Sequence, residues 1–451
     1  MHVVGALLAL LAFAPLGVGA LLLAGAWRLA AGVLRAGIAL FVGLAAGAVA
    51  LPPLLYLGLS PTLPVVLLLG ALVLGAGVLV ARRRPPRSDD RPVRIGPLGL
   101  LVIAGPVVLL AVDRVQTRIS NYDAFSIWML KARLLYRDGG WFLGALDHRA
   151  FAVQSIAPPV HREYPLGVPS LVAAVMHGSR GNVPDAALLY PVLLTGFAFV
   201  IWLVLEPRVP RLPLLAGLSL VLWLPVTREL GLAATGDLPL GVFFVAAALL
   251  LGIWFVEETP GTLPLVALLG AAALACKRDA IADCGVLAVL ALVETARLRR
   301  PDLARRLAVA LVLMFLTIVP WRVWVSVHHI RNQDVGIGNG HLSSNVHHLG
   351  WIVSRLWDFL VGRGYVGVAP LAAGLAALAL VRTRQWRLPV SVLVFGAALF
   401  AALILVYLDA TAALPYLVHY SGERTVFPLC LFSASILPLL LVRALRAGSD
   451  P

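Results

Sequence analysis

The sequence is poor in charged residues. Only 13% of its 451 residues are Asp, Glu, Lys or Arg, whereas 61% are hydrophobic. This composition excludes a water-soluble domain of this length, which needs charged side chains over its surface. The apolar residues also fall in blocks of about 17–25, the length that crosses about 30 Å of hydrocarbon. The chain is therefore predicted to be an integral membrane protein.

Cysteine and histidine patterns point to no cofactor. The three cysteines, Cys276, Cys284 and Cys430, have the spacing of neither a disulfide framework nor a metal site. We interpret them as small apolar residues inside helices. The histidines at 328, 329, 341, 347 and 348 include two adjacent pairs but define no coordination geometry, and we interpret them as solvated loop residues.

The net charge of +14 has a membrane explanation. Basic residues cluster at 81–94, 297–306 and 382–387, between apolar blocks rather than on a soluble domain. Arginine-rich loops of this kind stay on the cytoplasmic side of a membrane. No nucleic-acid partner is therefore expected.

The apolar blocks predict an all-α polytopic membrane protein with about thirteen transmembrane helices. The N-terminus lies outside, the C-terminus inside, and the first block is a permanent span rather than a cleaved signal. The polar stretch 113–185 lies outside and contains outer-face juxtamembrane helices, one of them over the apolar residues 166–177. The predicted spans are 3–25, 36–58, 63–81, 96–112, 186–205, 212–226, 238–256, 262–275, 280–296, 306–326, 366–382, 388–408 and 425–443.

Three carboxylates stand on the predicted outer face. Asp123 begins an amphipathic helix, Glu163 precedes a Tyr-Pro pair, and Asp237 lies where the chain re-enters the membrane. Helix capping is the structural alternative for Asp123 and Asp237, and the alternative for Glu163 is that its neighbours are an interfacial Tyr anchor and a Pro that starts a helix. Three acids at one depth favour a site, in which Asp123 accepts a proton from an acceptor hydroxyl.

Lysine is almost missing. Among 36 basic residues only Lys131 and Lys277 are lysines, and both fall on the predicted outer face. A compact ammonium suits a phosphate that must bind and then leave. Arg424, at the start of the last span, either reaches out to the interface or grips a pair of phosphate oxygens. Chance placement is the alternative for the two lysines.

The order of these motifs resembles the GT-C superfamily of membrane glycosyltransferases, especially its aminoarabinose-transferase and protein O-mannosyltransferase branch. The resemblance covers about residues 96–440, which divides the chain into an N-terminal three-helix membrane segment, 1–95, and a GT-C-like module, 96–451. The motifs are YDAFSIW with Asp123, EYPLGVP with Glu163, GDLPL with Asp237, CKRDA with Lys277 and ERTVFP with Arg424.

The resemblance implies an inverting transfer on the outer face of the plasma (inner) membrane. A sugar would pass from a polyprenyl-phosphate donor to a cell-envelope glycan, lipid or protein, with Asp123 as the catalytic base. Lys277, Arg424 and Lys131 would bind the donor phosphate. Glu163 and Asp237 would position the acceptor or hold a divalent cation, which some members of the superfamily use and others do not.

Two other classes of function stay open. A lipid or solute transporter, such as a flippase, moves its substrate without bond chemistry and is expected to carry ionisable residues near the middle of its spans. A lipid-linked glycan polymerase or ligase shares the surface site but takes a diphosphate-linked donor, and Arg-rich outer loops would favour it.

Overall fold

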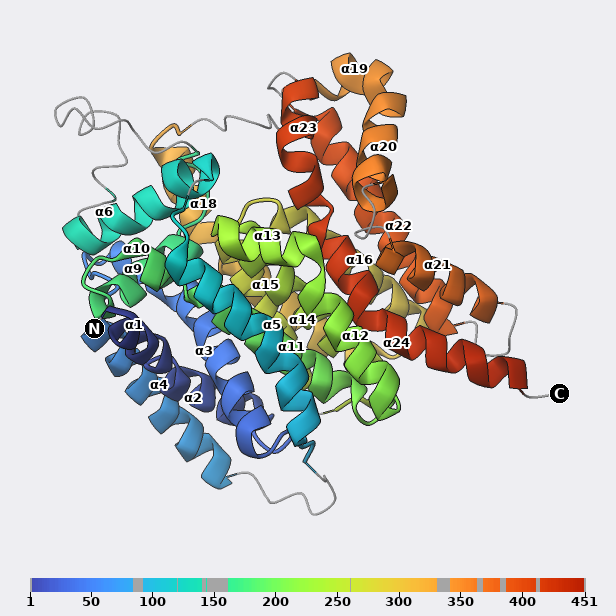
Figure 1. Ribbon diagram of the computed structural model, residues 1–451, viewed down its shortest axis with the longest axis horizontal. Helices are drawn as coiled ribbons and strands as arrows, with labels where there is room; N and C mark the ends of the chain where they lie inside the picture. The colour runs from blue at the N-terminus through green and yellow to red at the C-terminus, as the bar shows by residue number, and fades with distance from the viewer. Residues whose placement is uncertain are drawn as a thin grey trace. The chain divides into compact units, whose positions relative to one another are not determined.

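The protein is helical throughout its described residues. The computed structural model describes residues 2–83, 92–119, 121–139, 143, 161–259, 261–330, 341–362, 368–381, 387–410 and 414–449 (Figure 1). Within these ranges there is no β-strand, and an isolated backbone bridge joins Ala30 to Val93. The predicted all-α class is confirmed.

The chain forms two compact units. The larger comprises Met1–Val204, Glu229–Arg278 and Val309–Ile330, and the smaller comprises Leu205–Arg228, Asp279–Ala308 and Arg331–Pro451. Helices α13 (Pro225–Ala233) and α17 (Pro301–Leu316) contribute residues to both. The other helices of the larger unit are α1 (His2–Leu11), α2 (Ala14–Ala24), α3 (Gly32–Leu55), α4 (Leu63–Arg83), α5 (Pro97–Gln116), η1 (Ala124–Met129), α6 (Leu130–Asp138), α9 (Gly167–Gly178), α10 (Val183–Ala186), α11 (Leu189–Leu205), α14 (Asp237–Glu257), α15 (Thr262–Cys276) and α18 (Val319–Val327).

The smaller unit is built around the last helix. Helices α12 and α21 pack against α24, and α16 and α21 pack against α22. The close approach of α12 to α24 needs a residue without a side chain, because a Cβ atom on Gly217 would collide with the ring of Pro438. Its helices are α12 (Arg211–Trp223), α16 (Ala280–Leu298), α19 (His341–Asn345), η3 (Val346–His348), α20 (Leu349–Trp357), η4 (Asp358–Gly362), α21 (Val368–Val381), α22 (Arg387–Leu408), α23 (Leu414–Thr425) and α24 (Phe427–Ser449).

Nine helical segments among the described residues are long and apolar enough to cross a membrane. They coincide with nine of the predicted spans, which confirms a polytopic membrane protein. The nine segments are His2–Ala24, Gly32–Leu55, Leu63–Arg83, Pro97–Gln116, Val183–Leu205, Asp237–Glu257, Pro301–Val327, Arg387–Leu408 and Leu414–Ala447.

The other four predicted spans are also helical, but none meets this test as a single helix. Helices α15 and α21 are short, whereas α12 and α13 meet it together but are bent by 45° at the break between them. Helix α16 carries three charged side chains, Asp283, Glu294 and Arg297. The total of about thirteen spans stays a prediction.

The core of the larger unit is a set of closely packed apolar helices. Helices α3 and α4 lie along α2, α14 packs on α15, and both α9 and α15 pack on α3 (Figure 1). The helix predicted over 166–177 exists as α9, but its residues 167–176 are buried among α1, α3, α6 and α15 instead of lying on a surface. Its apolar side chains have neighbours on all sides, and this favours burial over an interfacial position.

Glycines let α2 and α3 approach closely. A Cβ atom on Gly17 would collide with the backbone of Ala39, and one on Gly43 would collide with the carbonyl oxygen of Phe13. Small residues commonly permit such contact between membrane helices, where van der Waals packing rather than the hydrophobic effect drives association.

We expect Gly43→Ala to lower the free energy of unfolding by about 1–3 kcal/mol, because the new methyl group overpacks a backbone contact. Gly105→Ala in α5 is the matched control, since nothing lies within 4 Å of its added carbon. Thermal unfolding in detergent measures both variants. An unchanged midpoint for Gly43→Ala would contradict the close approach.

Candidate functional site

The ends of α14 and α15 hold a buried ion pair. Asp237 is the first residue of α14, and Lys277 follows the last residue of α15 in extended conformation. The Lys277 Nζ donates a hydrogen bond to Asp237 Oδ1 over 2.7 Å, and the two side chains are only 9% and 5% exposed. Each charge suits its position, since a helix N-terminus favours an anion and a helix C-terminus favours a cation. The structure therefore joins two of the predicted site residues.

A second buried amine holds the turn that carries Glu163. Lys131 is fully buried on α6, and its Nζ donates to the carbonyl oxygens of His161 (2.6 Å) and Tyr164 (3.3 Å). The Nδ1 of His161 lies 3.1 Å from Glu163 Oε1, and the indole of Trp321 donates to the Glu163 carbonyl oxygen over 3.0 Å. Lys131 thus binds backbone oxygens in a solvent-shielded position, and the phosphate contact predicted for it from the sequence stays a prediction.

Burial shifts the pKa values of Lys131 and Glu163 in opposite directions. It lowers the pKa of the Lys131 ammonium from 10.5 to about 7, although the charge of Glu163 opposes this shift. Burial also raises the pKa of Glu163, but the hydrogen bond and charge of His161, with the charge of Lys131, outweigh burial and keep that pKa below its ordinary value. Glu163 is therefore a buried, ionised carboxylate at neutral pH.

Trp128 connects the two buried groups. Its ring is 1% exposed and its centroid lies 5.7 Å from that of Tyr164. On another side, a Cβ atom on Gly236 would meet the same ring at 2.5 Å, so the backbone next to Asp237 rests directly on the indole. The ring lies between the 161–164 turn and the start of α14.

Asp123 lies at the N-terminal end of η1, the helix that also contains Trp128. It is half-buried at the start of η1, a π-helix, and the cap is provided by Asn121, whose Oδ1 accepts from the amide of Ala124 over 3.1 Å. The capping role considered for Asp123 is therefore filled by another residue. The predicted amphipathic face is confirmed, because Ala124, Ile127, Trp128, Lys131 and Leu135 are all buried.

Two arginines extend the site beyond what the motifs indicated. Arg322 lies within electrostatic range of both Arg278 and Glu163. Arg278 is half-buried directly after Lys277, and Arg322 is exposed directly after Trp321. Arg322 thus lies near one like charge and one carboxylate, and these three groups together carry an excess of positive charge, which favours an anionic ligand. Arg278 adjoins a motif lysine and could have been suspected, whereas nothing in the sequence marks Arg322.

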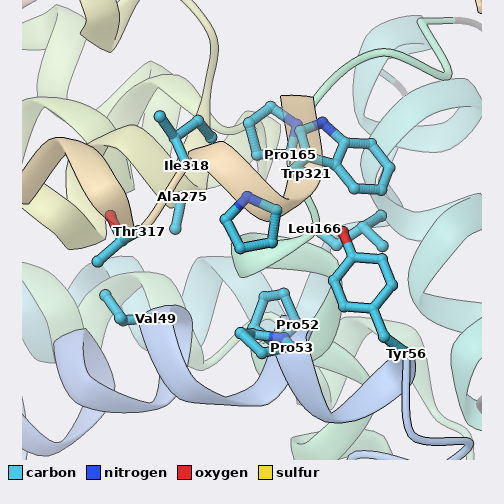
Figure 2. Close-up of a pocket in the computed structure, with 11 residues that line it drawn as sticks. Val49, Pro52, Pro53, Tyr56, Pro165, Leu166, Ala275, Thr317, Ile318 and Trp321 are labelled. Carbon is cyan, nitrogen blue, oxygen red and sulfur yellow. The ribbon is translucent and has the colours of Figure 1, made fainter. Parts of the chain in front are cut away.

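An apolar pocket adjoins this charged cluster. It is a small depression, partly open to the outside. Figure 2 shows Pro52 and Pro53 of α3 on one side and Thr317, Ile318 and Trp321 on the other. The remaining lining residues are Val49, Tyr56, Pro165, Leu166, Ala275 and Pro320. Burial raises the pKa of Tyr56 to about 12, so its phenol stays neutral.

The pocket and the cluster share segments of the chain. Pro165 and Leu166 follow the turn that carries Glu163, and Ala275 lies two residues before Lys277. Trp321 lines the pocket and also donates its hydrogen bond to Glu163. The apolar pocket and the charged cluster are thus adjacent within the larger unit.

One further predicted phosphate ligand, Arg424, belongs to α23 of the smaller unit. Its guanidinium donates to the Tyr420 carbonyl oxygen over 3.1 Å. Its contact with a phosphate stays a prediction. In the described part of the chain, no three His, Cys, Asp or Glu side chains gather as a metal ion requires.

The chain matches no protein-family model, and neither a characterised protein nor a solved structure is detectably similar to it.

Removing one member of the buried pair is expected to be costly. Asp237→Asn or Lys277→Met should each lower the free energy of unfolding by about 3–5 kcal/mol, because one buried charge loses its counter-charge. The double variant should cost less than the sum of the two. Asp302→Asn, in an exposed pair with Arg300, is the control and should change little. Additive losses, measured by thermal unfolding in detergent, would show that the pair is not coupled.

The low pKa of Lys131 predicts a pH dependence of stability. Between about pH 7 and its ordinary 10.5, the unfolded chain binds a proton that the folded chain lacks, so the free energy of unfolding rises with pH. We expect the unfolding midpoint to rise from about pH 7 to about pH 9 more in the wild type than in Lys131→Met. Identical pH profiles for the two proteins would refute the depressed pKa.

Proposed function

We propose that the protein is a membrane glycosyltransferase that takes a sugar from a polyprenyl-phosphate donor. The observation that carries the proposal is the charged cluster of Lys277, Asp237, Glu163, Arg278 and Arg322 beside an apolar pocket. A ligand that suits both parts has an anionic head and a hydrocarbon tail. A lipid phosphate has this form, and the GT-C resemblance of the sequence supports a sugar as the group attached to it.

The donor phosphate has three cationic neighbours in this proposal. Arg278 and Arg322 supply an excess of positive charge, and guanidinium groups bind phosphate oxygens in pairs. Lys277 belongs to the same cluster through its position next to Arg278, with Asp237 holding the ammonium in place. The first carbons of the tail would occupy the pocket between α3 and α18. Arg424 remains a further candidate ligand from the smaller unit.

Asp123 is the proposed general base. Its half-exposed carboxylate would take the proton of an acceptor hydroxyl while that oxygen attacks the anomeric carbon of the sugar. The bond between this carbon and the phosphate oxygen breaks, and the electron pair leaves with the lipid phosphate. Positive charge around the phosphate stabilises the leaving group. Attack on the face opposite the phosphate inverts the anomeric configuration.

The distribution of charge favours an enzyme over a transporter. In the described candidate spans, most ionisable side chains stand near an end, as Asp237 and Arg114 do, or at a break between helices, as Glu423 and Arg424 do. A transporter or flippase is expected to place them near the middle of a span. The proposal also includes the finer topology: about thirteen spans, the basic loops in the cytoplasm, and a reaction on the outer face of the plasma membrane with an envelope glycan, lipid or protein as acceptor.

We expect Asp123→Asn to lower kcat for sugar transfer by at least about 100-fold, because the acceptor hydroxyl loses its proton acceptor. Donor affinity should change little. The measurement is transfer from polyprenyl-phosphate-linked sugars to envelope extract by the purified protein in proteoliposomes. Asp138→Asn, at the exposed end of α6, is the matched control. Near-normal turnover by Asp123→Asn would rule out this base.

A further inference from the structure

The turn at residues 161–164 has a strained backbone. His161 has a φ of +55°, in the left-handed region that a residue with a side chain adopts at a cost of about 1–3 kcal/mol. The Tyr164 amide closes the turn on the His161 carbonyl oxygen over 3.1 Å. Such a conformation persists only where the surroundings hold it. The turn must therefore be fixed by contacts from other elements.

Lys131 supplies two of these contacts from α6. Its Nζ binds the carbonyl oxygens at both ends of the turn, 2.6 Å from His161 and 3.3 Å from Tyr164. It also lies 5.9 Å from the centre of the Tyr164 ring, within range of a cation–π contact. Burying an ammonium is expensive, and Lys131 has no exposed surface. A methionine in its place would avoid this cost and would pack as well.

The turn also carries Glu163. The carboxylate is 1% exposed and bound by His161, and the Glu163 carbonyl oxygen is held by Trp321. Its charge acts on both Lys131 and Arg322. Arg322 is repelled by Arg278, and the Glu163 carboxylate opposes this repulsion. A shift of the turn would therefore change the electrostatic surroundings of Arg322.

We infer that Lys131 is a positioning residue that fixes the 161–164 turn, so that Glu163 can hold Arg322 near Arg278 for an anionic lipid headgroup. This role rests on the proposed function for its ligand, but the turn itself can be tested without any ligand. It differs from a phosphate contact by Lys131, because here the ammonium acts on the headgroup only through Glu163.

Among the described residues, two charges on the turn act on Lys131: Glu163, which attracts the ammonium, and Arg162, which repels it. His161 in turn binds Glu163. A pKa of about 7 means that Lys131 loses its charge as pH rises through neutrality, while its N–H groups can still donate to the carbonyls.

The first part of the test measures the turn by itself. Hydrogen exchange of the Tyr164 amide, followed by mass spectrometry in nanodiscs, should become at least about tenfold faster in Lys131→Met, a change of about 1.4 kcal/mol in opening free energy. Trp321→Phe, which removes the other donor to the turn, should accelerate the same amide and serves if Lys131→Met does not fold. Arg137→Met, at the exposed end of α6, is the control and should leave the exchange unchanged.

The second part measures binding through a double-mutant cycle. The probe is undecaprenyl phosphate, with inorganic phosphate and phosphatidylglycerol as separate arms that distinguish the headgroup from the tail and from bulk lipid. Lys131→Met and Glu163→Gln should each raise the Kd for the probe by about tenfold, and the double variant should be no worse than the weaker-binding single variant, because Lys131 acts through Glu163.

Each outcome decides the inference. Faster exchange of Tyr164 with non-additive losses of affinity supports it. Unchanged exchange in Lys131→Met, or additive losses that mark a direct contact with the headgroup, overturns it. If the wild type binds none of the three probes, the proposed donor is rejected, and equal exchange rates in Lys131→Met and the wild type would then reject the role in the turn as well. Tighter binding of phosphatidylglycerol than of undecaprenyl phosphate would identify the ligand as bulk lipid and reject the sugar donor.

Discussion

The buried pair between Lys277 and Asp237 constrains the larger unit. Both charges are removed from water, and their mutual attraction offsets this loss only while α14 and α15 bring them within hydrogen-bond distance, 2.7 Å. The helix ends contribute as well, because the N-terminus of α14 favours the carboxylate and the C-terminus of α15 favours the ammonium. The pair therefore links the start of α14 to the end of α15.

The second buried lysine, Lys131, stabilises a turn instead of pairing directly with a carboxylate. Lys131 binds main-chain oxygens at both ends of a turn whose backbone is strained at His161. Trp128 lies between this turn and the residue before Asp237, so both buried amines belong to one packed region. The two lysines of a chain that otherwise uses arginine therefore serve as internal anchors. A slim ammonium reaches such enclosed places more easily than a planar guanidinium does.

The arginines and the pocket supply the complementary part of the site. Arg278 and Arg322 are more exposed than the lysines, so they can meet a ligand, and the pocket between α3 and α18 offers apolar walls nearby. Buried charges inside and more exposed charges at the edge are what the proposed binding and release of a lipid phosphate would need.

The sequence by itself determined the helical membrane class, and it singled out Asp237 and Lys277, which the structure joins in one ion pair. Apolar blocks produce helices because lipid leaves backbone groups no other partner, and scarce lysines on polar segments stand out against arginine. Only the tertiary structure showed which residues these side chains contact. Asp237 is 40 residues from Lys277 and Lys131 is 30 from His161, and no periodicity reports contacts at such separations. Packing likewise buried α9, set Lys131 against the backbone of the 161–164 turn, and brought Arg322 near Glu163, because these depend on which helices meet.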